Sequence, residues 1–297
     1  MKNLRLTIDK ITGNVFLIFT LLATVTVILI GAGLYYKSAP ILHGNSLSSL
    51  LLSAEWKPFK SSFGFLSYIA GTLSITAIAI IIALPISLLT GIYLSEYAHA
   101  KVKRALLPPI DLLSGIPPVI YGVWGVLIIV PFVQEKIAVH FVEFSSGYST
   151  LAGGIVLAIM IIPLIISILL EVFSTIPDGL REASLSVGAT KWETIKFVVL
   201  KKSLPGIIAA VVLAISRAFG ETIAVLMVCG NIPQIPHSIF DSCYPLPALI
   251  ANNYGEMLSV PMYESALMLA AFILFIIIFL FNAISRIILY RLERSSN

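Results

Sequence analysis

The sequence predicts an all-α membrane protein with six transmembrane helices. Of its 297 residues, 58% are hydrophobic and only 11% are charged, which excludes an ordinary soluble domain. A helix that crosses roughly 30 Å of hydrocarbon needs about 20 mainly apolar residues. Six stretches meet that requirement, and they lie at about residues 12–36, 67–94, 109–133, 149–172, 205–230 and 262–290.

The second and fourth stretches each contain one internal proline, and the first could be mistaken for a leader. The first stretch is predicted to be a retained anchor, because it is too long for a secretory signal and no small-residue cleavage site follows it. Pro85 lies in the second stretch and Pro163 in the fourth. Neighbouring helices satisfy the carbonyl groups that a proline frees within a membrane, so both stretches are predicted to cross as helices.

Basic residues are distributed unequally between the two sides of the predicted spans. Fourteen lie in the N-terminal tail, the C-terminal end and the loops 95–108 and 173–204. The opposite side has four: Lys37, Lys57, Lys60 and Lys136. The positive-inside rule therefore predicts that both termini are cytoplasmic. The net charge of +4 reflects this topology and does not indicate nucleic-acid binding.

Several classes of site are not predicted. The sequence contains no Gly-x-x-x-x-Gly-Lys-Ser/Thr motif, so no ATP or other cofactor is expected on this chain. Neither the four scattered histidines nor Cys229 and Cys243 have the spacing of metal ligands, and two cysteines alone do not establish a disulfide. No catalytic or metal site is expected. The lack of a convincing internal repeat argues mildly against a secondary transporter built from two inverted halves.

The fifth stretch contains an arginine at membrane depth. Arg217 lies twelve residues after Pro205, which is roughly 18 Å along a helix and close to the bilayer midplane. A charge at that depth costs on the order of 3 kcal/mol, so it should face a bundle interior or water. Glu221 is expected on the same helical face, and Thr222 adds a hydroxyl group. The guanidinium group suits an oxyanion; the alternative is a structural Arg217–Glu221 pair.

The third stretch contains a predicted helix break. Gly115, Pro117 and Pro118 should interrupt the helix and leave unpaired amides and carbonyls at membrane depth. Such groups are tolerated only against protein or a water-lined cavity, and helix N-termini favour anions. Tyr121 is then expected to line the path. The alternative is a simple proline kink that aids packing.

A polar segment lies in the loop between the fourth and fifth stretches. Residues 182–189 read Glu-Ala-Ser-Leu-Ser-Val-Gly-Ala, and apolar and charged residues mix there as in a short amphipathic helix. Gly188 supplies a turn that favours glycine. Residues 192–200 are predicted to form a second short helix. We expect this segment to be a docking surface; an incidental surface loop is the alternative.

Three segments resemble those of the phosphate ABC-transporter permeases. Residues 182–188 resemble the Glu-Ala-Ala-x-x-x-Gly coupling loop of ABC importers, with Ser184 in place of the second alanine. Residues 217–222 are similar to the Arg-Ala-x-Gly-Glu-Thr segment of the phosphate permeases. Residues 115–122 resemble their Gly-Ile-Pro-Ser-x-x-Tyr-Gly segment, with Pro118 in place of serine.

Two outer segments distinguish the PstC type from the PstA type within this family. Residues 55–58 and 245–256 look more like the PstC type. The resemblance covers essentially the whole chain and implies a type I ABC-importer permease fold. It divides the chain into an N-terminal anchor with an outer loop at 1–66, a permease core at 67–290 with a cytoplasmic coupling loop at 173–204, and a tail at 291–297.

The resemblance also implies partners and roles. The partners would be a PstA-type permease, a dimer of PstB-type ATPase subunits that binds ATP–Mg, an extracytoplasmic phosphate-binding protein, phosphate and the lipid bilayer. The substrate path would include Arg217, Glu221, Thr222 and Tyr121. The ATPase-coupling residues would be Glu182, Ala183, Gly188 and Ala189.

The expected function is a transport subunit, not an enzyme, of an ATP-driven phosphate importer in a prokaryotic cell membrane. One alternative is a permease for another oxyanion, such as sulfate or molybdate. A stand-alone anion channel or carrier that uses Arg217 and Glu221 is a second alternative, from a different class of protein.

Overall fold

The computed structural model describes residues 2–256, 260 and 262–296, and most of them are helical. The helices are α1 (Lys2–Gly44), α2 (Leu47–Leu52), α3 (Leu66–Ile92), α4 (Ala100–Gly115), α5 (Pro118–Trp124), α6 (Val130–Phe132), α7 (Thr150–Ser174), α8 (Asp178–Ser186), α9 (Lys191–Glu193), α10 (Leu200–Phe219), α11 (Ile223–Val228), α12 (Leu246–Asn253) and α13 (Tyr263–Ser296). Strands β1 (Trp56–Lys57) and β2 (Ser62–Phe63) form an antiparallel hairpin.

Short helical segments of other pitch connect or extend several helices. Four are π-helical: η2 (Tyr93–Tyr97), η3 (Gly125–Ile129), η4 (Val133–Ile137) and η6 (Thr194–Val199). Two are 3₁₀ turns, η1 (Pro58–Lys60) and η5 (Ala138–His140). Such π-helical turns mark places where the regular hydrogen-bond pattern of a long helix shifts.

The prediction of six membrane-spanning helices is confirmed for the described part of the chain. The six helices that are long and apolar enough to cross are Ile11–Gly44, Leu66–Tyr97, Pro118–His140, Thr150–Ser174, Lys191–Phe219 and Tyr263–Arg291. Pro85 and Pro163 lie inside α3 and α7 without ending either helix. Both helices therefore accommodate their proline as expected.

The third span differs from its predicted limits of 109–133. Residues 109–115 belong to α4, a separate helix that contains Lys101, Lys103, Arg104 and Asp111 and has no buried residue. The chain breaks after Gly115, and the apolar helix then continues from Pro118 to His140. The predicted limits, which rest on hydropathy, joined the apolar end of α4 to the span. Hydropathy does not detect the break between them, because Gly115 and the two prolines produce it.

The fifth span also differs from its predicted limits of 205–230. The helix begins at Lys191, includes the expected second short helix at 192–200, and continues past Pro205 to Phe219. It stops at Gly220, and the remaining residues form the short helix α11. The fifth stretch is therefore two helices with a break, not one continuous span.

Helices α3 and α7 pack closely along their length. A β-carbon added at Gly154 would lie 2.4 Å from the side chain of Ile78, and one added at Gly91 would lie 3.2 Å from Leu169. Gly91 also contacts the ring of Phe173. Small residues at helix contacts let two backbones approach within a membrane. The two helices therefore form a close-packed unit, and Gly91 lies in it near the C-terminal ends of both helices.

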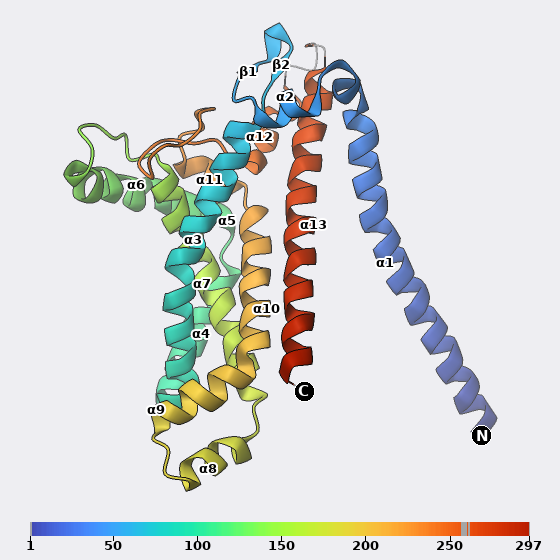
Figure 1. The fold of residues 1–297 in the computed structure, drawn as a ribbon, viewed down its shortest axis with the longest axis vertical. Coiled ribbons are helices and arrows are strands. Elements are labelled where there is room, and N and C mark those ends of the chain that lie inside the picture. The colour runs from blue at the N-terminus through green and yellow to red at the C-terminus, as the bar shows by residue number, and fades with distance from the viewer. Residues whose placement is uncertain (1, 257–259, 261, 297) are drawn as a thin grey trace.

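The two ends of the molecule differ in content (Figure 1). Helices α8 and α9 lie at one end, and β1, β2, α2 and α12 lie at the other. Both chain termini point toward the α8 end (Figure 1). Helix α1 diverges from the bundle and approaches α13 only in its second half, where Gly31 contacts Phe275. Much of the apolar surface of α1 is therefore uncovered within this chain.

Candidate substrate path and coupling site

Arg217 lies at the end of α10, two residues before the helix stops at Phe219. The amide of Gly220 donates to the carbonyl of Arg217 at 3.2 Å, and the amide of Glu221 donates to that of Ala218 at 3.2 Å. These bonds close the last turn of the helix. Arg217 is exposed, and its guanidinium group forms no hydrogen bond or ion pair within the described part of the chain.

The prediction that Glu221 shares a helical face with Arg217 is wrong, because the helix ends between them. The Glu221 Oε1 atom accepts a hydrogen bond from the Ala224 amide at 3.2 Å, in the first turn of α11. The Thr222 hydroxyl donates to the Gly220 carbonyl at 3.3 Å. A carboxylate is stabilised at a helix N-terminus by free amides and the helix dipole. Glu221 therefore caps α11 and does not neutralise Arg217.

A second break separates α4 from α5. Helix α4 ends at Gly115, and α5 begins at Pro118, where a proline fits because the first helical amide needs no partner. Tyr121 is buried, and its hydroxyl donates to the Leu113 carbonyl at 2.7 Å. This bond satisfies a carbonyl at the end of α4 and joins the two sides of the break. The Arg217 charge interacts electrostatically with Tyr121.

Close packing of α5 against α11 brings the two breaks together. A β-carbon added at Gly122 would lie 2.6 Å from the Met227 sulfur and 3.2 Å from the Ala224 Cα atom. One added at Gly125 would lie 2.8 Å from Val228. A side chain at Gly125 would require one of the stiff valine side chains around it to shift, and one at Gly122 would require the end of Met227 to move. The sequence-predicted residues Arg217, Glu221, Thr222 and Tyr121 thus belong to one region. Of these four, Arg217 is the one whose side chain forms no hydrogen bond or ion pair within the described chain.

The predicted coupling residues lie on α8 and in the turn that follows it. Glu182, Ala183 and Gly188 are exposed, and Ala189 is half-buried. Gly188 has φ of +88°, a left-handed conformation that favours glycine, and its amide donates to the Leu185 carbonyl at 3.0 Å. Leu185 and Val187 add exposed apolar surface beside these residues. This end of the molecule therefore presents a surface that the chain itself does not cover.

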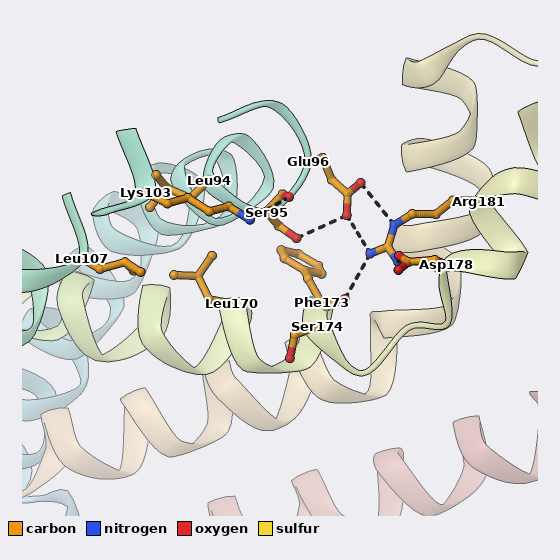
Figure 2. Close-up of a pocket in the computed structure, with 10 residues that line it drawn as sticks. All are labelled: Leu94, Ser95, Glu96, Lys103, Leu107, Leu170, Phe173, Ser174, Asp178 and Arg181. Atoms are coloured by element: carbon orange, nitrogen blue, oxygen red, sulfur yellow. Dashed lines mark hydrogen bonds and ion pairs between the residues drawn. The ribbon is translucent and has the colours of Figure 1, made fainter. Parts of the chain in front are cut away.

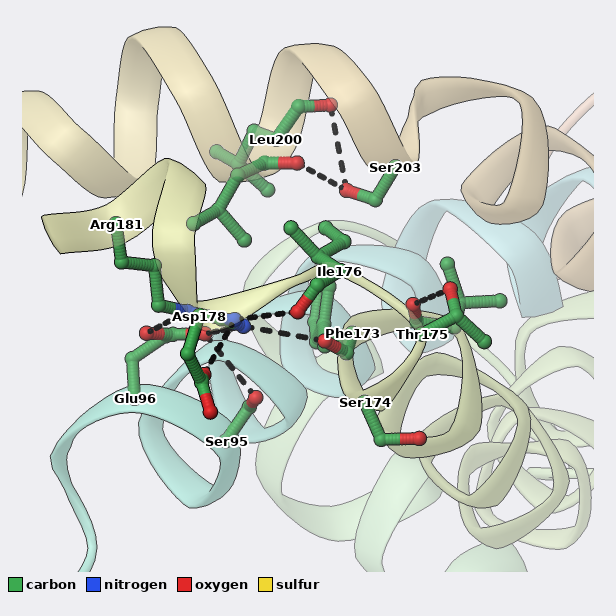
Figure 3. A network of polar contacts seen from close by, with 12 residues as sticks. Ser95, Glu96, Phe173, Ser174, Thr175, Ile176, Asp178, Arg181, Leu200 and Ser203 are labelled. Carbon is green, nitrogen blue, oxygen red and sulfur yellow. Dashed lines mark hydrogen bonds and ion pairs between the residues drawn. The ribbon is translucent and has the colours of Figure 1, made fainter. Parts of the chain in front are cut away.

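Arg181 fixes α8 to the rest of the bundle. Its Nη2 atom donates to Glu96 Oε1 at 2.8 Å and its Nε atom to Glu96 Oε2 at 3.3 Å. It also donates to the carbonyls of Ile176 and Phe173 at 2.7 and 3.1 Å (Figure 3). The Glu96 carboxylate, through its hydrogen bonds, raises the pKa of Arg181 above its ordinary value. Arg181 therefore stays charged and links η2, the end of α7 and α8.

The position that departs from the family pattern, Ser184, also forms a structural contact. Its hydroxyl lies 2.9 Å from that of Thr194 in η6. Thr190 caps the following helix, because it accepts from the Glu193 amide at 3.3 Å while its own amide donates to the Glu193 carboxylate at 2.7 Å. The loop between the fourth and fifth spans is therefore ordered by side-chain bonds at both of its short helices.

Sequence reasoning did not identify the Glu96–Arg181 pair. Arg181 counted as one of the basic residues on its side of the membrane and as a charged residue of the predicted amphipathic helix, and Glu96 was not singled out. The two residues are 85 positions apart, so no spacing rule connects them. The one available signal was a carboxylate at the end of one span and an arginine just beyond the end of another.

The described residues offer no evident metal site. Nowhere in residues 2–256, 260 and 262–296 do three or more His, Cys, Asp or Glu side chains form a group that could hold a metal ion. Cys229 and Cys243 are both buried as free thiols, and the Cys243 amide donates to the Cys229 carbonyl at 3.0 Å. These cysteines therefore pack the loop that follows α11 against the end of that helix.

The family of the chain is established by its sequence. Residues 83–296 match the model of the family described as "Binding-protein-dependent transport system inner membrane component". The chain belongs to this family. As a binding-protein-dependent transport permease whose described residues include six apolar helices, it is a multi-pass protein of the cell membrane.

Named relatives of this permease cover most of its length. The phosphate transport system permease protein PstC of Xylella fastidiosa is 38% identical over 260 residues, which cover 83% of this chain and 80% of that protein. PstC of Mesorhizobium japonicum is 37% identical, covering 82% and 79%. The probable ABC transporter permease protein YqgH of Bacillus subtilis is 34% identical, covering 94% and 90%.

A solved structure confirms the predicted type I ABC-importer permease fold. A chain of the MetNI methionine ABC transporter, in an inward-facing conformation, matches this permease with a TM-score of 0.56. The match covers 77% of this chain and 94% of that chain at 21% identity. At this identity the likeness concerns the fold alone.

Proposed function

We propose that this chain is the transmembrane permease subunit of an ATP-driven importer of inorganic phosphate. The observation that carries the proposal is the exposed Arg217 guanidinium, which forms no hydrogen bond or ion pair in the described chain and lies at the break between α10 and α11. The named PstC relatives support phosphate as the substrate. They do not favour the sulfate or molybdate alternative.

The chemistry of this region suits a tetrahedral oxyanion. The planar guanidinium fork donates to two oxygens at once, which a lysine cannot do. Glu221 leaves Arg217 free, because it accepts from the Ala224 amide. Tyr121 directs its proton to the Leu113 carbonyl and forms no hydrogen bond with Arg217. In this proposal phosphate meets Arg217 on a path that a second, PstA-type permease completes.

Energy for transport comes from partner subunits. In this proposal the surface formed by Glu182, Ala183, Leu185 and Val187 docks on a dimer of PstB-type ATPase subunits, which bind ATP–Mg. This chain itself binds no cofactor and hydrolyses no ATP. Closure of the ATPase dimer moves α8 and changes which side of the membrane can reach Arg217.

The proposed orientation puts α8 and both termini in the cytoplasm. The excess of basic residues on that side supports it, as do termini that point toward the α8 end. The phosphate-binding protein then docks at the end with β1, β2 and α12. A thiol reagent that cannot cross membranes should not label Val187→Cys in intact cells. Labelling from outside would reverse the orientation.

Transport by the assembled complex tests the function. The chain is co-expressed with a PstA-type permease and a PstB-type ATPase from the same organism and reconstituted in liposomes with the phosphate-binding protein. We expect ATP-dependent uptake of radiolabelled phosphate that excess sulfate or molybdate does not compete away. Uptake of sulfate in preference to phosphate would assign a different oxyanion. Uptake by this chain alone, without an ATPase, would mean a channel or carrier.

A further inference from the structure

The π-helical segment η2 is the place where the coupling loop joins the membrane bundle. It continues α3 without a break, from Tyr93 to Tyr97. Just before it, Gly91 packs against Leu169 and Phe173 of α7. Three residues of η2, Ser95, Glu96 and Tyr97, each contact a different side chain: Lys103, Arg181 and Lys191, respectively. We call these six residues the η2 junction.

The strongest contact of the η2 junction is the pair between Glu96 and Arg181. Only 9% of the Glu96 side chain and 18% of the Arg181 side chain are exposed. Both carboxylate oxygens accept from the guanidinium group, so the pair is bidentate. A bidentate pair between two largely buried groups resists rotation and sliding, because neither group can move without losing a charged hydrogen bond.

A second bond in the network offers a natural internal comparison. Arg181 also donates to Asp178 at 3.1 Å, but 89% of the Asp178 side chain is exposed. This pair lies within α8, at positions i and i+3, and an exposed pair of this kind contributes little to stability. The same guanidinium group therefore makes one contact that fixes α8 to η2 and one that does not.

Two further contacts join η2 to its surroundings. The Lys191 ammonium lies 4.6 Å from the centroid of the Tyr97 ring, which connects α9 to η2. The Lys103 ammonium donates to the Ser95 carbonyl at 3.2 Å, which connects α4 to η2. A pocket of about 440 Å³ lies beside these contacts, between α4, α7 and α8 (Figure 2). Both short helices of the coupling loop are thus tied to the same five-residue segment.

We propose that the η2 junction makes the coupling loop and the end of α3 move as one body, with Glu96, Arg181 and Tyr97 as positioning residues for ATP-driven gating. The inference rests on the proposed function. A displacement of α8 then reaches α3 through Glu96 and a displacement of α9 reaches it through Tyr97. Because α3 packs tightly on α7, the motion passes into the bundle as a rigid shift and is not lost in a flexible loop.

The test uses the complete complex and compares matched variants. Glu96→Gln keeps the size and one acceptor oxygen but removes the charge. Asp178→Asn removes the charge of the other, exposed partner of Arg181. Tyr97→Leu removes the ring that faces Lys191, and Tyr97→Phe keeps it. The readouts are the number of ATP molecules hydrolysed per phosphate taken up, and the hydrogen exchange of the α8 amides in the same complex.

The junction predicts a specific pattern. Glu96→Gln should raise ATP hydrolysed per phosphate about tenfold, the effect of weakening one charged hydrogen-bonded contact. Exchange of the α8 amides should rise with it. Tyr97→Leu should raise the ratio about twofold, while Tyr97→Phe and Asp178→Asn should match the parent. If Glu96→Gln does not assemble, the comparison of Tyr97→Leu with Tyr97→Phe decides.

Two outcomes would overturn the inference. One is a parental ratio and parental α8 exchange in Glu96→Gln. The other is an equal effect of Asp178→Asn and Glu96→Gln. Failure of the proposed function is separate, since it would appear as absence of ATP-driven phosphate uptake in the unaltered complex. The exchange measurement would still test the junction in that case.

Discussion

Two arginines in different parts of this bundle show opposite uses of the same side chain. Arg181 donates to both oxygens of Glu96 and to two backbone carbonyls, and it is largely buried. Arg217 is exposed at the end of α10 and forms no hydrogen bond within the described part of the chain. One guanidinium group is satisfied by its own chain, and the other is not.

The difference follows from the local helix ends. Arg181 follows the C-terminus of α7, where free carbonyls attract a cation, and Glu96 supplies the compensating charge. Arg217 lies before a break at which the nearby carboxylate, Glu221, caps the next helix. A charge in an apolar span that its own chain leaves unpaired needs water, a ligand or a partner chain. The comparison therefore separates a structural arginine from a candidate functional one.

The largest expected effect is the loss of transport when Arg217 is replaced. Arg217→Ala should reduce phosphate uptake at least about a hundredfold, since two charged hydrogen bonds to the anion would be lost. The complex should still assemble, because Glu221 keeps its bond to the Ala224 amide. Arg217→Lys should also impair uptake, as it keeps the charge but not the fork. The measurement is uptake set beside the yield of purified complex.

The same experiment can also contradict the assignment of Arg217 to the substrate path. If Arg217→Ala assembles poorly and Glu221→Ala restores assembly, the two residues form the structural pair that the capping geometry argues against. Uptake equal to that of the parent would remove Arg217 from the substrate path.

Replacing Arg181 should instead lower the stability of the complex. Arg181→Gln leaves the buried Glu96 carboxylate without its charged partner, which costs about 3 kcal/mol in the free energy of unfolding. The double variant Glu96→Gln with Arg181→Gln should recover part of this loss, because no unpaired charge remains. Thermal unfolding of the purified complex measures both. A single Arg181→Gln variant as stable as the parent would show that the pair does not hold α8.

Much of this fold could be predicted from hydropathy and local breakers, but the features that depend on long-range contact could not. Six apolar stretches and the residues Gly115, Pro117 and Pro118 indicated the spans and one break. Gly220 did not indicate the second break, because a glycine inside an apolar stretch is often tolerated in a membrane helix. The Glu96–Arg181 pair could not be predicted from the sequence, because it joins segments that only the packing of α3 on α7 brings together.

A smaller effect is expected at the turn after α8. Gly188 has φ of +88°, and an added β-carbon would meet no atom within 4 Å. The cost of a substitution is therefore conformational and not steric. Gly188→Val should strain the turn by about 1–2 kcal/mol and lower phosphate uptake per ATP, whereas Gly188→Asn should be tolerated, because asparagine adopts this conformation more readily. Equal coupling in the two variants would contradict a role for this turn.

The smallest effect should come from Ser184, and it tests whether α8 is held mainly by Arg181. The Ser184 hydroxyl bonds that of Thr194 at 2.9 Å, which ties α8 to η6. Ser184→Ala removes one neutral hydrogen bond, and its cost should be about 1 kcal/mol in unfolding free energy. Alanine also matches the family pattern at this position, so phosphate uptake per ATP should stay near the parental value. Thr194→Val, which is close in shape, is the matched variant on the other side of the bond. Either substitution could uncouple the transporter as strongly as Glu96→Gln does. In that case the Ser184–Thr194 contact connects α8 to the bundle, and the Glu96–Arg181 pair does not.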